Sequence, residues 1–148
     1  MSAPQVWQVP EMGAEVPPLI RTIALTDMVA YAGATWDWHR LHYDPAYLAD
    51  KQLPAPVVDG QVFGALLAEA LLDWLGPEAF VRRLDFRFKA LVFAGETVRC
   101  EGAVTGVEGD AVSFDLRVVV IGADGEVVRV AAAPCTAVVV RRPEEATG

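Results

Sequence analysis

Residues 60–75 restrict the fold of this chain more than any other segment, because apolar side chains surround nearly the whole helix that they predict. The apolar positions are Val62, Phe63, Ala65, Leu66, Leu67, Ala68, Ala70, Leu71, Leu72, Trp74 and Leu75. A helix that is apolar on almost every side is stable only when other parts of the protein cover it. Gly76-Pro77 marks its end. The sequence therefore predicts one buried helix, and the rest of the chain has to supply its cover.

The residues after this helix predict an antiparallel sheet that can cover it. Apolar and polar side chains alternate around residues 83–90, 98–104, 112–120 and 126–141, as in strands with one buried face. Gly95, Gly109-Asp110 and residues 122–125 mark the turns between them. Pro134 predicts a bulge or an edge position within the last strand. A long central helix wrapped by an antiparallel sheet is the α+β arrangement called the hotdog fold.

The chain of 148 residues is expected to hold one domain with short extensions. Four prolines make residues 1–18 an extended arm: Pro4, Pro10, Pro17 and Pro18. A short strand follows over residues 19–25. The hotdog domain is predicted to cover residues 19–142, and residues 143–148 form a polar tail.

Two small helices are expected before the buried one. The first runs from Thr26, as its cap, to about Gly33, and Asp27 places negative charge at its positive end. The second begins with Asp44-Pro45, an N-cap followed by proline at the first helical position, and ends near Asp50. Both helices would lie close to the segment between them.

Composition limits the partners and the compartment. The net charge of −8 argues against a nucleic-acid or anionic membrane surface. The N-terminus lacks the basic and apolar regions of a signal peptide, and no apolar run reaches the length of a membrane span. Cys100 and Cys135 follow no metal or redox spacing and lie in apolar strand patterns. We expect a cytoplasmic protein whose two cysteines are reduced core residues.

The chemistry-bearing side chains are concentrated in residues 35–45. Both histidines of the chain, His39 and His42, lie there together with Trp36, Asp37 and Trp38. Such a concentration of titratable groups in an otherwise apolar chain indicates a site. Five helical steps would place Asp37 and His42 about 140° apart. They can therefore act together only if the segment is an irregular turn, with Trp36 and Trp38 as walls.

This segment and the order of elements resemble the MaoC-like dehydratases, or (R)-specific enoyl-CoA hydratases. The family pattern runs Tyr-Ala, a small pair, Gly-Asp-x-Asn-Pro-Ile-His-x-Asp, and this chain has Tyr31-Ala32, Asp37, His42 and Asp44 at matching places. The variant around His42 is similar to the branch with 3-hydroxyacyl-thioester dehydratases and mesaconyl-type hydratases. The likeness covers about residues 19–140.

The chain departs from the family pattern at four places. Trp36 replaces a glycine, and His39-Arg40 replace Asn-Pro. Asp59 stands where the family usually has histidine, and residues 60–75 lack the serine that many relatives carry. These differences bear on the substrate class and the rate more than on the fold.

The resemblance implies a hydro-lyase that reversibly hydrates an enoyl-CoA to the 3-hydroxyacyl-CoA. An ionised Asp37 can take a proton from water, and His42 can hold that water or protonate the α-carbon. Unpaired N–H groups at Gly60 and Gln61 would stabilise the thioester oxygen. Trp36, Trp38, His39 and Asp59 are candidates for the substrate pocket, although Asp59 also suits a helix cap that points away.

The coenzyme A part of the substrate needs a cationic contact on this acidic chain. The candidates for its phosphates are Arg82, Arg83, Arg87 and Lys89, for which a solvated strand face is the competing interpretation. No cofactor and no metal is expected, because Asp37, His39, His42 and Asp44 fit no familiar ligand spacing. A homodimer, or a hetero-oligomer with another hotdog chain, is expected because one hotdog leaves part of its sheet unpaired.

Two other functions remain open from the sequence. The first is a hotdog acyl-CoA thioesterase, in which Asp37 would activate water against the thioester carbonyl. The second is a non-catalytic partner subunit of a heteromeric hydratase, an interpretation that Asp59 and the missing helix serine favour. Each of these side chains also has a purely structural interpretation. Asp37 can be a turn residue, His42 a packed histidine and Asp44 a helix cap.

Overall fold

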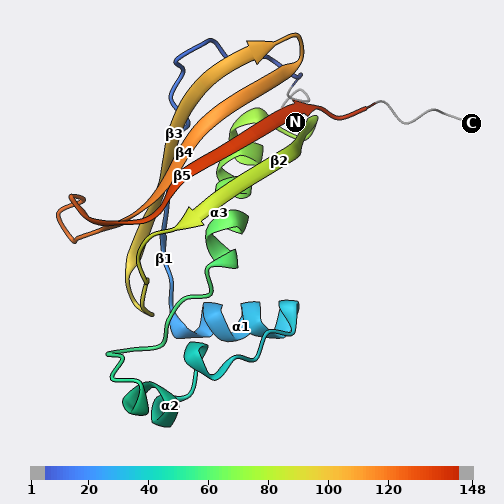
Figure 1. The fold of residues 1–148 in the computed structure, drawn as a ribbon. Coiled ribbons are helices and arrows are strands. Elements are labelled where there is room, and N and C mark those ends of the chain that lie inside the picture. The colour runs from blue at the N-terminus through green and yellow to red at the C-terminus, as the bar shows by residue number, and fades with distance from the viewer. Residues whose placement is uncertain (1–5, 144–148) are drawn as a thin grey trace, which may run out of the picture.

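The long helix α3 (Gln61–Leu75) lies in the curve of a five-stranded antiparallel sheet (Figure 1). The computed structural model describes residues 6–143. The strands are β1 (Leu19–Thr22), β2 (Ala79–Phe88), β3 (Thr97–Glu108), β4 (Ala111–Ile121) and β5 (Val127–Arg141). They are ordered β1-β3-β4-β5-β2, and every neighbouring pair is antiparallel. The predicted helix wrapped by a sheet is confirmed.

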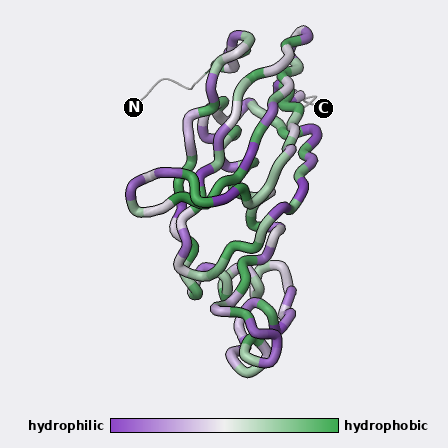
Figure 2. The backbone as a smooth tube through the Cα atoms, turned by 60° about the vertical axis from the view of Figure 1, so that its left-hand side comes forward, coloured by the Kyte–Doolittle hydropathy of each residue, from purple (hydrophilic) through white to green (hydrophobic). Residues whose placement is uncertain are grey.

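The core lies between α3 and the concave face of the sheet. Leu67 and Leu71 of α3 are fully buried, as are Val98, Phe114 and Val139 on the strands. Full burial of each such side chain contributes about 1.5–3 kcal/mol to folding. Hydrophobic and hydrophilic residues are interspersed along the strands, as an alternating pattern requires (Figure 2). This side of α3 anchors the fold.

The prediction that α3 is covered on nearly every side is wrong for one of its faces. Leu72 is 38% exposed, and Ala65 and Asp73 are also exposed. The sheet curls around the helix from one side only, so the outer face of α3 stays uncovered by the described residues.

Pro134 lies at a bulge, one of the two positions that the sequence allowed. β5 is an inner strand, between β4 and β2. Leu116 pairs with Cys135 and Val118 with Ala132, so two residues of β5 oppose one residue of β4. The bulge accommodates a proline, which has no N–H to donate to a ladder.

The arm lies along β3 over the residues that the structure describes. Val16 N–H donates to the Gly102 carbonyl (2.9 Å), Gly13 N–H donates to the Val104 carbonyl (3.0 Å), and Glu15 forms a bridge with Ala103. Residues 1–5 of the predicted arm and residues 144–148 of the predicted tail lie outside the described residues.

The first small helix differs at both ends from its prediction. α1 spans Leu25–Thr35, and it begins before Thr26 because the Asp27 carboxylate accepts the Ala24 N–H (2.9 Å). It continues past Gly33 and ends at Trp36, whose φ of 58° is left-handed. Glycine adopts this conformation without strain, and other residues do so at a cost of about 1–2 kcal/mol.

The second small helix follows its prediction. α2 spans Pro45–Asp50, and the Asp44 carboxylate caps it by accepting the N–H groups of Ala46 (3.0 Å) and Tyr47 (3.3 Å). The short 3-10 helix η1 (Arg40–His42) precedes it. α1, η1 and α2 lie beyond the end of the sheet, near the N-terminus of α3 (Figure 1).

The cysteines are buried, as predicted, and neither forms a disulfide. Burial raises the pKa of the Cys100 thiol to about 12, and burial also raises the pKa of Cys135. Thiols of this kind stay protonated and unreactive at neutral pH. Among the described residues, no helix combines the length and the apolar character needed to cross a membrane.

Gly102→Ala is expected to destabilise the fold by about 1–3 kcal/mol, because a side chain there overpacks the sheet. A Cβ at this position would lie 2.2 Å from the Asp115 carbonyl oxygen and 2.9 Å from the Leu116 Cα, both of which are backbone atoms. Urea denaturation measures the change. Gly106→Ala on the same strand is the matched control, because its Cβ would lie 3.5 Å from Ser113, an ordinary contact. Equal stability of the two variants would contradict this packing.

Candidate active site

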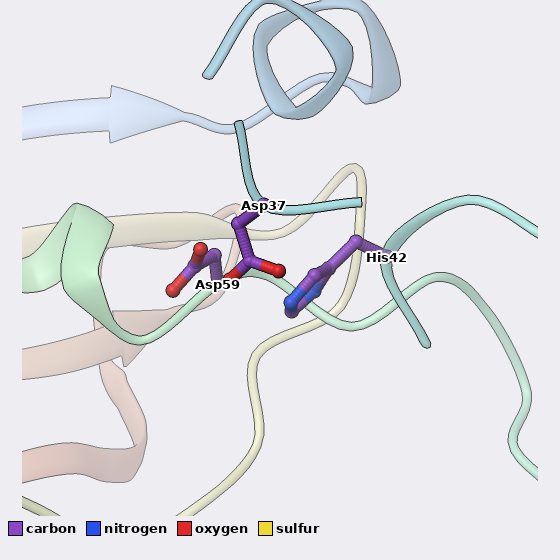
Figure 3. Close-up of side chains that lie close together, drawn as sticks. All are labelled: Asp37, His42 and Asp59. Atoms are coloured by element: carbon purple, nitrogen blue, oxygen red, sulfur yellow. The ribbon is translucent and has the colours of Figure 1, made fainter. Parts of the chain in front are cut away.

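Asp37, His42 and Asp59 come together at the amino end of α3 (Figure 3). One polar atom from each side chain lies within 4.8 Å of the other two. Asp37 follows α1, His42 ends η1, and Asp59 immediately precedes the first turn of α3. Three separate segments thus deliver two carboxylates and an imidazole to one point.

Asp37 is oriented by its own backbone segment. The left-handed residue Trp36 turns the chain out of α1, and Asp37 Oδ1 then accepts the His39 N–H (3.2 Å). The turn is irregular, as the five-residue spacing to His42 required. Asp37 is exposed in the described chain, whereas His42 and Asp59 are partly buried.

His42 is oriented by a backbone carbonyl. Its Nδ1 lies 2.6 Å from the Val57 carbonyl oxygen. A carbonyl can only accept, so Nδ1 carries the proton of this bond. Nε2 is then the ring nitrogen left for the site, and it has no hydrogen-bond partner among residues 6–143.

Asp59 does not point away from the site, so that part of the sequence interpretation is wrong. Its Oδ1 does cap α3, by accepting the Gln61 N–H (2.9 Å). The same carboxyl group nevertheless lies with Asp37 and His42, because the cap turns it back over the helix end. The sequence places Asp59 at the helix start and Asp37 with His42 in one turn, but it does not indicate that Asp59 joins the other two.

This cap also changes which N–H groups remain at the start of α3. Gln61 N–H is occupied by Asp59 and is therefore not the unpaired donor that the sequence suggested. Val62 and Phe63 N–H groups bond to the carbonyls of Asp59 and Gly60. Gly60 N–H has no partner within the described part of the chain. Gly60 therefore keeps its predicted capacity as a donor.

A cavity of about 310 Å³ opens beside His42 and Gly60. It is lined by Leu41, His42, Val57, Val58, Gly60, Phe63, Phe88, Lys89, Ala90, Leu91 and Val92. A Cβ at Gly60 would come within 2.5 Å of the Phe88 ring, so only glycine leaves the present wall undisturbed. The walls are mostly apolar, and Lys89 is a charged side chain among them, a lining typical of a small-molecule pocket.

A larger hollow of about 850 Å³ among the described residues holds none of the predicted site residues. It lies around Arg99, Glu101, Arg117 and Pro134, on the side of the sheet turned away from α3. Glu101 is paired there with both arginines, which lower its pKa against the opposing effect of burial. Size alone does not locate the chemistry in this fold.

The other predicted pocket residues lie around the three side chains without lining the cavity. Trp36 and Trp38 pack edge to face, with 5.9 Å between their ring centroids, and Trp36 is 80% exposed. His39 Nδ1 accepts the Leu41 N–H (3.1 Å), and its ring lies edge to face against His42.

Of the predicted phosphate contacts, Lys89 alone lines the cavity beside His42. Arg82, Arg83 and Arg87 lie exposed on β2, and Arg83 pairs with Asp85 (2.6 Å). Arg83 is thus partly neutralised, while Lys89 forms no ion pair with a described residue.

The three clustered side chains are also the ones that could hold a metal ion. One imidazole nitrogen and two carboxylate oxygens form a donor set that zinc or manganese accepts. His39 and Asp44 do not belong to it, since one is bonded to Leu41 N–H and the other caps α2.

Sequence reasoning did not single out Tyr31 as a site residue. Its pKa is raised by burial and by the charges of Asp59 and Asp37, so its phenol lies within the field of the cluster. It also lines a second cavity of about 250 Å³, between α1 and α3, with Met28 and Val62. Tyr31 belongs to the family motif and lies one helical turn before the end of α1. Its place in the motif was the sequence signal that could have identified it as a site residue.

The chain belongs to the MaoC-like domain family, which it matches over residues 10–125. A curated relative is the (R)-specific enoyl-CoA hydratase of Aeromonas caviae, 29% identical over 93 residues, or 62% of this chain and 69% of the relative. The MaoC-like family that the sequence motif suggested is thereby confirmed.

Two solved structures show the same hotdog fold. The (R)-hydratase from A. caviae involved in PHA biosynthesis superposes with a TM-score of 0.79 and 26% identity, over 92% of this chain and 99% of that one. The ChsH1–ChsH2 complex from Mycobacterium tuberculosis gives a TM-score of 0.80 and 22% identity, over 90% of this chain and 100% of the matched one.

The two histidines are expected to hold their protons on opposite ring nitrogens when they are neutral. His42 should be protonated on Nδ1, which donates to Val57, and His39 on Nε2, because its Nδ1 accepts from Leu41. Nitrogen-15 NMR of the imidazole rings at alkaline pH measures both tautomers, and His39 serves as the internal control. Finding His42 protonated on Nε2 alone would contradict the site geometry.

Proposed function

We propose that this chain is a hydro-lyase that adds water reversibly to an enoyl-CoA, giving the 3-hydroxyacyl-CoA. The observation that carries the proposal is the meeting of Asp37 and His42 at the amino end of α3, beside the cavity that contains Gly60. Family membership and the hydratase relative support the same reaction class.

The reaction divides among three groups. The Asp37 carboxylate takes a proton from water as the oxygen attacks the β-carbon. Gly60 N–H, at the positive end of α3, stabilises the enolate-like thioester oxygen, and one such donor is worth about 10²–10³ in rate. His42, as an imidazolium whose Nδ1–H stays bonded to Val57, then gives its Nε2 proton to the α-carbon, and the proton held by Asp37 returns to His42.

The cavity beside His42 suits the thioester and the pantetheine arm. Its apolar walls exclude water from the reacting atoms, and its exposed rim at Leu91 leaves a way out to solvent. We assign the phosphate contact to Lys89, with Arg82, Arg83 and Arg87 further along β2. No cofactor other than the coenzyme A of the substrate is required for this chemistry.

A partner chain belongs to this proposal. β2 is an edge strand, and it exposes Phe80 (47%) and Phe88 (58%). An exposed edge with aromatic side chains is suited to pairing with another sheet. We propose a homodimer through β2, and light scattering of the purified chain tests it. A mixed pair with a different hotdog chain is the alternative, and the two-chain neighbour supports keeping it open.

Asp37→Asn and His42→Ala should each lower the rate of enoyl-CoA hydration by about 10²–10⁴, because each removes a proton-transfer group. Asparagine still accepts the His39 N–H, so the turn is preserved. The loss of enoyl absorbance with a short enoyl-CoA measures the rate, and circular dichroism checks folding. Asp50→Asn, on the exposed end of α2, is the control.

Unchanged turnover in both variants would overturn the assignment. Release of free thiol without loss of the double bond would identify a thioesterase instead. An inactive wild-type chain that gains activity only with a second hotdog chain would identify a partner subunit, which Asp59 favours by adding negative charge beside the thioester oxygen.

Lys89→Ala should raise the KM for an enoyl-CoA several-fold and leave the KM for the matching pantetheine thioester nearly unchanged. The truncated substrate lacks the phosphates of the nucleotide, so it loses nothing when the cation is removed. Steady-state kinetics with both substrates measures the difference, with Lys51→Ala on the exposed end of α2 as the control. An equal rise for both substrates would place the phosphates elsewhere.

A further inference from the structure

We propose that Asp59 is a further catalytic residue, which holds the attacking water together with Asp37 and His42. The inference rests on the proposed hydratase function and assigns a task to the aspartate that stands where relatives usually have histidine. It starts from the way in which the three side chains are fixed.

The two carboxylates are held in the same manner, each by the N–H group two residues further along the chain. Asp37 Oδ1 accepts from His39, and Asp59 Oδ1 accepts from Gln61. In each case the second oxygen, Oδ2, has no hydrogen-bond partner among the described residues. His42 is fixed by Val57 and keeps Nε2 free of described partners.

The spacing of the three groups fits one bridging water. They form no hydrogen bond with one another, although their polar atoms lie within 4.8 Å. In a triangle with sides of 4.8 Å, the longest that these contacts allow, the point equidistant from the corners is about 2.8 Å from each, an ordinary hydrogen-bond distance. A single oxygen atom can therefore contact all three groups at once.

The donors and acceptors of a water molecule then assign a partner to each of the three groups. Water has two protons to donate and two lone pairs. Two ionised carboxylates take both protons, so Nε2 of His42 must donate to one lone pair. An imidazole that carries protons on both ring nitrogens can donate from each of them. The second lone pair remains free for the β-carbon.

Every proton is accounted for in the resulting step. The water O–H bond breaks and its proton passes to Asp37, while Asp59 keeps the other proton in a hydrogen bond. The new C–O bond forms at the β-carbon, and the π electrons move toward the thioester oxygen. His42 Nε2–H then protonates the α-carbon, and the proton on Asp37 returns to His42. The two carboxylates and the imidazolium together have the same net charge as one carboxylate with a neutral imidazole.

The alternative is that Asp59 only caps α3, and Asp59→Asn separates the two roles. Asparagine is as good a cap as aspartate, so the Gln61 N–H keeps its acceptor. The amide nitrogen, however, cannot accept a proton from water. Asp124→Asn is the matched control, because Asp124 also accepts the N–H two residues on, that of Glu126 (3.0 Å), in the turn between β4 and β5.

The test measures kcat and KM for a short enoyl-CoA, the melting temperature, and binding of the corresponding saturated acyl-CoA by calorimetry. For Asp59→Asn we expect kcat to fall by about 10- to 100-fold. The melting temperature and the affinity for the saturated thioester should match those of the wild type and of Asp124→Asn.

Two results would overturn the role of Asp59. One is an unchanged kcat in Asp59→Asn. The other is a parallel loss of kcat, melting temperature and saturated-thioester binding, which marks a structural cap. If the wild type hydrates the enoyl-CoA and either of these results is found, the role of Asp59 is refuted and the proposed function is retained. Absence of hydration in the wild type and in Asp124→Asn refutes the proposed function, and the role of Asp59 with it.

Discussion

Burial of one side of α3 against the sheet is the constraint on which the rest of the molecule depends. The apolar contacts around Leu67 and Leu71 fix the helix within the curve of the strands. They also fix where its first turn projects, which is the open end of the sheet where α1, η1 and α2 lie (Figure 1). A helix terminus supplies a partial positive charge and free N–H groups. The core therefore determines the position of the site before any site residue is considered.

The polar groups of the site compete for a small number of backbone donors. Asp59 takes the N–H of Gln61, and the following N–H groups bond within the turn, so the N–H of Gly60, a residue that lines the cavity, is left without a partner among the described residues. A carboxylate beside that donor opposes the negative charge that develops on a thioester oxygen. In the proposed mechanism, the same carboxylate also holds the attacking water molecule. The proposed reaction depends on the balance between these two effects.

The sequence allowed the fold to be predicted because its periodicities reflect burial directly. The apolar helix, the alternating strands and the caps at Asp44 and Asp59 all have local causes, and the structure has them all. The ends of α1 were harder to predict from the sequence. The helix begins at a capping contact from Asp27 and ends where Trp36 adopts a left-handed backbone conformation. The meeting of Asp37 and His42 followed from the motif. The position of Asp59 beside them did not follow from the motif, because it depends on how two separate loops pack over one helix end.

The exposed face of α3 was also not predictable from composition alone. Ala65 and Leu72 look the same in the sequence as their buried neighbours, and only the one-sided curl of the sheet leaves them outside. An apolar residue on the surface of a single chain is the ordinary result when one sheet cannot surround a helix. Sequence periodicity reports that a segment is apolar and gives no account of how far the strands reach.

The contact between His42 and the Val57 carbonyl has a consequence for how the family can vary. The group that orients the imidazole belongs to the main chain, so no replacement of the Val57 side chain by another amino acid removes it. The path of the loop maintains this acceptor, through the bonds of Val57 to Leu41 and of Val58 to Val92. Side chains of this loop can therefore be substituted without changing the orientation of the histidine, provided that the loop keeps its length.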